Sequence, residues 1–131
     1  MTRFRYPLRL SLLLLPLTLA AAEPQALRLL PGTYQGEVFN GSDLDPVETR
    51  FTIDASGRLA GSYTVDEENG AYSGMLSSIV FEDARTISMA WTDKFGEGYA
   101  VLQFSSDFTS FSGEWTNATG AGGLPWSGER R

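Results

Sequence analysis

Hydrophobic and polar residues alternate by twos through most of this 131-residue chain, with turn residues at short intervals. In residues 47–54 the apolar row is formed by Val47, Thr49, Phe51 and Ile53. A turn over residues 54–57 follows, and alternation then resumes across residues 58–65. Two alternating segments joined by a tight turn predict an antiparallel hairpin with one buried face and one solvated face.

The same pattern recurs along the chain and predicts eight strands. They span about residues 33–39, 47–54, 58–65, 71–81, 86–92, 98–105, 110–116 and 124–130, with bounds good to a few residues. In the fourth strand the apolar register shifts between Leu76 and Ile79, which predicts a β-bulge near Ser77 and Ser78. No segment after residue 22 has a convincing helical period of 3.6 residues.

Short strands joined by hairpins favour an all-β fold. We predict a single eight-stranded antiparallel up-and-down barrel over residues 33–131, preceded by an N-terminal arm over residues 23–32. Closure into a barrel removes the exposed strand edges that promote aggregation. A β-sandwich is the alternative, because its strands alternate in the same way.

The first 22 residues have the composition of an export signal. Basic residues (Arg3, Arg5 and Arg9) precede an apolar run over residues 10–19, and Ala20-Ala21-Ala22 follows. This order predicts a signal peptide cleaved after Ala22. The run is shorter than the roughly 20 apolar residues that span a bilayer. We therefore expect a secreted or periplasmic protein without a membrane span.

The charge and the missing residue types narrow the function. Three of the ten basic residues lie in the leader, which leaves seven against sixteen acidic residues and a formal charge of −9. So acidic a chain is not expected to bind nucleic acid, whose phosphates require lysine and arginine. The chain has no histidine and no cysteine, which removes disulfides, Ser-His and Cys-His catalysis and most zinc sites. We expect no enzyme, no catalytic residues and no cofactor.

Glycine recurs beside aromatic residues on the apolar rows, for example Gly61 with Tyr63 and Gly113 with Trp115. Such glycines either allow a small sheet to curve beneath covering aromatics or leave space in the lumen for a ligand. In the second case the candidate ligand-binding residues are Tyr34, Tyr63, Tyr72, Trp91, Trp115 and Trp126. Their flat surfaces, with hydroxyl or indole N–H tips, suit a small hydrophobic or neutral ligand.

Acidic residues gather at one end of the predicted barrel, because successive connections of an up-and-down barrel alternate between its ends. The acidic residues there are Asp43, Asp45, Asp66, Glu67, Glu68, Asp93 and Glu97, and Lys94 is the basic one. This rim either keeps an exported protein soluble or attracts a cationic protein. The second alternative describes an interaction protein of the envelope, such as an inhibitor of a cationic hydrolase or an assembly factor. Neither Asp43-x-Asp45 nor residues 66–69 forms an EF-hand loop, and we assign no metal site.

Two stretches resemble the calycin barrels, which include lipocalins, fatty-acid-binding proteins and avidin-like proteins. They are Gly32-Thr33-Tyr34 and the segment Phe51-Thr52-Ile53 followed by Gly57, Leu59, Gly61 and Tyr63. The resemblance implies a barrel whose ligand enters at the mouth with the acidic loops. It also implies that Arg130 stacks on Tyr34, a cation–π contact. The polar residues that hold biotin in avidin-like proteins have no match here.

Overall fold

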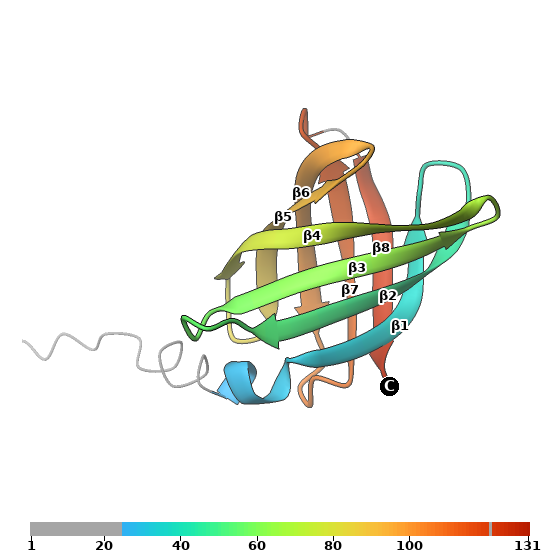
Figure 1. Ribbon diagram of the computed structural model, residues 1–131. Helices are drawn as coiled ribbons and strands as arrows, with labels where there is room; N and C mark the ends of the chain where they lie inside the picture. The colour runs from blue at the N-terminus through green and yellow to red at the C-terminus, as the bar shows by residue number, and fades with distance from the viewer. Residues whose placement is uncertain (1–24, 121) are drawn as a thin grey trace, which may run out of the picture.

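Eight antiparallel strands form a closed barrel in the computed structural model, which describes residues 25–120 and 122–131. The strands are β1 (Gly32–Phe39), β2 (Leu44–Ile53), β3 (Leu59–Glu67), β4 (Gly70–Phe81), β5 (Thr86–Asp93), β6 (Gly96–Phe104), β7 (Ser110–Asn117) and β8 (Gly122–Arg130). Each strand pairs with the next in sequence, and β8 pairs with β1 to close the sheet (Figure 1). The predicted up-and-down barrel is confirmed, and the sandwich alternative is wrong. The predicted signal peptide lies outside the described residues.

Strand β2 begins three residues earlier than predicted, because the hairpin before it is short. The side-chain oxygen of Asn40 accepts hydrogen bonds from the backbone N–H groups of Ser42 (2.8 Å) and Asp43 (2.9 Å). This local turn lets the ladder continue to the pair Phe39 and Leu44. Alternation alone does not reveal such a side-chain-stabilised turn.

The predicted bulge in β4 is confirmed. The register between β4 and β5 shifts between Ser77 and Val80, and Ser78 has a positive φ of 52°. The extra residue allows a strand to bend and increases its local twist. The strand can then follow the curvature of the closed sheet.

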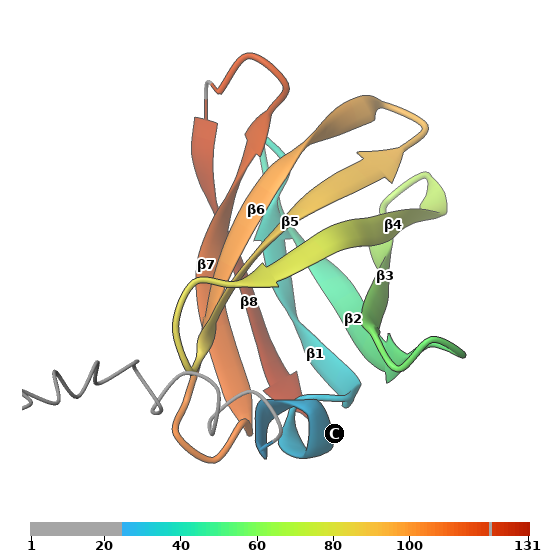
Figure 2. The same ribbon diagram turned by 90° about the vertical axis from the view of Figure 1, so that its left-hand side faces the viewer.

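The N-terminal arm contains a short helix over residues 25–29, in a segment where the sequence has no helical period. Ala26 in this helix and Leu30 directly after it are fully buried. Figures 1 and 2 show this helix beneath the end of the barrel where the C-terminus also lies. A five-residue segment is too short for periodicity to reveal, and burial against the barrel compensates for its low intrinsic stability. Among the described residues, no helix has the length and hydropathy needed to cross a membrane.

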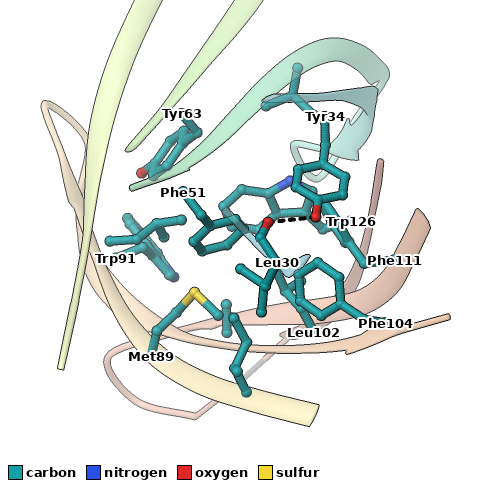
Figure 3. Close-up of a cluster of buried hydrophobic side chains, with 14 of the residues drawn as sticks. Leu30, Tyr34, Phe51, Tyr63, Met89, Trp91, Leu102, Phe104, Phe111 and Trp126 are labelled. Atoms are coloured by element: carbon teal, nitrogen blue, oxygen red, sulfur yellow. Dashed lines mark hydrogen bonds between the residues drawn. The ribbon is translucent and has the colours of Figure 1, made fainter. Parts of the chain in front are cut away.

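The lumen near this end is filled by aromatic side chains. Tyr34 lies edge-on to Phe104 and Phe111, with ring centroids 5.6 and 5.5 Å apart. Figure 3 shows these rings together on one side of the buried cluster, with Tyr63 and Trp91 on the other. Ile53, predicted to face inward, is instead 41% exposed at the last position of β2.

Glycines in the inner rows make room for aromatic rings on paired strands. Gly74 is paired with Tyr63, and a Cβ on Gly74 would lie 2.1 Å from Cζ of the Tyr63 ring. Gly98 is paired with Trp91, and a Cβ on Gly98 would lie 2.8 Å from the indole nitrogen of Trp91. The aromatic rings thus cover bare backbone, as the curvature explanation expected.

Candidate ligand cavity

A cavity of about 770 Å³ occupies the other end of the barrel, between the hairpins β1–β2, β3–β4 and β5–β6. Its aromatic lining consists of Phe39, Tyr63, Tyr72, Trp91, Phe95, Trp115 and Trp126. Val38 and Val65 also contribute. Most of these residues belong to the inner rows of their strands, so the barrel backbone holds them in place.

Five of the six residues predicted to bind a ligand line this cavity: Tyr63, Tyr72, Trp91, Trp115 and Trp126. The sixth, Tyr34, is fully buried at the opposite end, where its hydroxyl donates a hydrogen bond to the Leu30 carbonyl oxygen (2.6 Å). Arg130 lies over its ring, with the guanidinium carbon 4.8 Å from the centroid, as the calycin resemblance implied. The structure therefore places Tyr34 away from the cavity.

The three indoles line the cavity, and the N–H group of each is hydrogen-bonded within the protein. Trp91 donates to the Thr116 carbonyl oxygen (2.9 Å), and Trp115 donates to that of Phe39 (2.9 Å). Trp126 donates to the hydroxyl of Thr49 (3.1 Å). The indole N–H groups are therefore engaged within the protein. Their hydrogen bonds fix the rings, and Trp91 and Trp115 meet edge-on with centroids 5.5 Å apart.

Five predicted rim acids line the cavity, and three of them continue inward-facing rows of the strands. Asp45 precedes Val47 in the inner row of β2, Glu67 follows Val65 in β3, and Asp93 follows Trp91 in β5. Asp43 and Glu68 complete the set, whereas Asp66 and Glu97 lie outside it. If the two-residue period is extended past the apolar part of each strand, it distinguishes the acids that face inward from those that face outward.

The carboxylates act on the two cavity tyrosines. The Tyr63 hydroxyl donates to Oδ2 of Asp93 (2.6 Å), and burial, followed by this hydrogen bond and the aspartate charge, raises the pKa of Tyr63 well above its ordinary value. Burial, followed by the charges of Asp93, Glu67 and Asp45, raises the pKa of Tyr72 to about 12. The negative charges of these three carboxylates thus disfavour ionisation of the Tyr72 hydroxyl.

No carboxylate of the cavity takes part in a salt bridge within residues 25–120 and 122–131. The ion pairs there join Glu48 to Arg50 and Arg131. Lys94 instead lies over two rings at the mouth, with its nitrogen 5.4 Å from the centroid of Tyr72 and 4.9 Å from that of Phe95. In the part of the chain that the structure describes, no three acidic side chains are grouped closely enough to hold a metal ion.

The glycines proposed to leave lumen space do not line the cavity. A Cβ on Gly61 would lie 3.0 Å from Cβ of Leu76, and one on Gly113 would lie 2.0 Å from the Val101 carbonyl oxygen. Both positions are tightly surrounded. The open space therefore lies among the aromatic and acidic side chains at the mouth, and not where glycine replaces a side chain.

No model of a known protein family matches the chain, and a search of curated proteins found no matching sequence. The strand order is compatible with a calycin-like barrel. The geometry of the cavity is therefore the basis for inferring a function.

Proposed function

We propose that this protein is an exported, non-enzymatic binding protein that holds a small organic molecule in the cavity at its acidic mouth. The aromatic cavity of about 770 Å³ carries the proposal. Ligand sites commonly measure roughly 300–1,000 Å³ and combine apolar walls with a few polar groups. Aromatic side chains from several strands meet here around a small number of oxygens.

The position of the acidic residues favours a small ligand over a cationic protein. Asp45, Glu67 and Asp93 lie on inward rows and are only partly exposed. A protein partner would require charges that point outward, as Asp66 does on the exposed side of β3. Binding rather than catalysis is favoured because hydrogen bonds within the protein hold the indole N–H groups and the Tyr63 hydroxyl.

Native mass spectrometry of the protein from its producing cell tests occupancy directly. We expect a mass of a few hundred daltons above the chain cleaved after Ala22, released on unfolding. The same spectrum tests the predicted export. A bare chain that also binds none of a panel of small aromatic compounds would contradict the proposal.

A filled cavity tests the location of the site. Val38 lines the cavity, and Val38→Phe would add a ring inside it. Val101 is 47% exposed on the outer side of β6, so Val101→Phe is a matched control. All three tryptophans of the chain line the cavity, so their fluorescence should respond to a ligand. We expect Val38→Phe to lower affinity at least about tenfold and Val101→Phe to leave it unchanged. Equal affinities would place the ligand elsewhere.

A further inference from the structure

We infer that the ligand of this cavity is an amphipathic organic cation, whose apolar body lies against the indoles and whose ammonium group lies among Asp45, Glu67 and Asp93. This inference rests on the proposed binding function and specifies the class of ligand. It depends on the combination of two surfaces in one cavity. Aromatic faces and carboxylates each favour a cation, and here they adjoin.

The carboxylates form the outer part of the cavity. They come from three different strands, β2, β3 and β5, and each is two residues along from a buried inward-facing side chain. All three line the same cavity, so their negative charges lie around one space at the mouth. Low-dielectric walls around such a site strengthen its attraction for a positive group.

The aromatic residues form the inner part and part of the rim. Trp91 and Trp115 meet edge-on in the cavity, and Tyr72 and Phe95 do the same at the rim, with centroids 5.0 Å apart. The outer pair already has a cation above it, the ammonium of Lys94. Since their N–H groups are used within the protein, the indoles offer apolar and π surface rather than hydrogen bonds. They suit an alkyl or aryl body and an ammonium at its end.

Other classes of ligand fit this cavity less well. A carboxylate or phosphate would face five acidic side chains, and among the described residues that line or cover the cavity the basic one is Lys94 on the rim. Calcium needs six to eight oxygens in close array. The described residues contain no group of three acids placed to supply them. A large organic cation tolerates a wider spacing between the acidic side chains, because its charge is spread over several atoms.

The test compares molecules that differ only in charge. The probes are a series of phenylalkyl-trimethylammonium ions with increasing chain length, and for each its neutral tert-butyl isostere, titrated by tryptophan fluorescence and calorimetry at low ionic strength. We expect the cation to bind at least about tenfold more tightly than the isostere, a preference that added salt reduces.

Adjacent acids of β3 provide the matched variants. Glu67 lines the cavity, while Asp66 faces outward on the same strand. We expect Glu67→Gln and Asp93→Asn each to weaken cation binding about three- to tenfold, with the isostere changed less than about twofold. Asp66→Asn should leave both unchanged. The Asp93 carboxylate accepts from both the Tyr63 hydroxyl and the backbone N–H of Phe95, whereas the amide introduced by Asp93→Asn keeps one oxygen acceptor, so Glu67→Gln is the cleaner of the two variants.

Each outcome is decisive. Equal binding of cation and isostere would overturn the inference and leave the proposed binding function intact. Equal losses in Glu67→Gln and Asp66→Asn would also overturn it, because the attraction would then come from net charge alone. If no member of either series binds while a copurified neutral molecule is found, the inference fails and the proposed function stands. If neither series binds and no molecule copurifies, both fail.

Discussion

The two ends of the barrel differ in packing and in charge, although the same inner rows of side chains run through both. At the end next to the N-terminal helix, here called the closed end, Tyr34 packs edge-on against Phe104 and Phe111, and Arg130 is surrounded by acceptors. At the open end, rings stand around a cavity and carboxylates have no cationic side chain bound to them in the described ranges. The closed end therefore pairs its positive charge with acceptors inside the protein, whereas the negative charges of the open end have no cationic side chain bound to them.

This difference separates stability from recognition within a small fold. The guanidinium of Arg130 donates to the carbonyl oxygens of Leu29, Pro31 and Phe108 and to the Tyr34 hydroxyl. These bonds connect the N-terminal helix, the β6–β7 connection and β8. A rigid closed end of this kind can hold an open end whose side chains are not packed to full density.

The largest effect we predict is on stability at the closed end. Tyr34→Ala should lower the free energy of unfolding by about 3–5 kcal/mol, because a fully buried ring is removed from a filled core. Tyr72→Ala, at the open end, should cost about 1 kcal/mol or less, since Tyr72 is only partly buried. Urea denaturation measures both values. Similar losses would show that the two ends contribute equally to folding stability.

Arg130 provides a second test of the closed end. Arg130→Met should lower the free energy of unfolding by about 2–3 kcal/mol, since the change removes its hydrogen bonds to carbonyls and its contact with the Tyr34 ring. Arg131 makes an exposed salt bridge to Glu48, so Arg131→Met should change stability by less than about 0.5 kcal/mol. Equal losses of unfolding free energy in the two variants would indicate that net positive charge, and not the contacts of Arg130, stabilises the closed end.

Alkaline pH should weaken the closed end through Tyr34. Burial outweighs the lowering effects of Arg130 and raises the pKa of Tyr34 to about 12. The unfolded chain releases this proton near pH 10, so the stabilisation is complete below about pH 10 and is lost as pH rises toward 12. We expect this residue to account for a loss of up to about 2 kcal/mol, measured by denaturation at several pH values. In Tyr34→Phe the slope should be correspondingly smaller, and an unchanged slope would assign the loss to other groups.

Alternation along the chain was sufficient to predict the barrel, the eight strands and the bulge at Ser77–Ser78. It was also sufficient to place Tyr63, Tyr72, Trp91, Trp115 and Trp126 on one lining. These features are local, because a two-residue period assigns each side chain to a face. The closed end was harder to predict because Tyr34 has the same local pattern as the cavity tyrosines. Its role depends on contacts with Leu30, which directly follows a helix too short for periodicity to detect, and with Phe108, which is distant in sequence. The contact with Arg130 was implied by the calycin resemblance and not by alternation.

Phe95 shows a different limit of the sequence. It lies in the connection between β5 and β6 and is 65% exposed, so no alternating row includes it. Its place at the mouth comes from the hairpin, in which its backbone N–H donates to Oδ1 of Asp93 (2.8 Å). The acids Asp45, Glu67 and Asp93 could have been assigned to the interior by extending the inner rows. The partition of the lumen into packed and open parts could not, because it depends on how rings from different strands meet.

The smallest effect we predict concerns Lys94, which brings a positive charge to the open end. Lys94 lies over Tyr72 and Phe95 and is exposed, so Lys94→Gln should change the free energy of unfolding by less than about 0.5 kcal/mol. Loss of its charge should deepen the negative potential at the mouth and raise the affinity for phenylalkyl-trimethylammonium ions about two- to threefold, with the neutral isosteres unchanged. Fluorescence titration at low ionic strength measures the effect, and Arg85→Gln, in the β4–β5 connection at the opposite end, is the control. A fall in cation affinity would mean that the Lys94 side chain helps to cover the bound ligand.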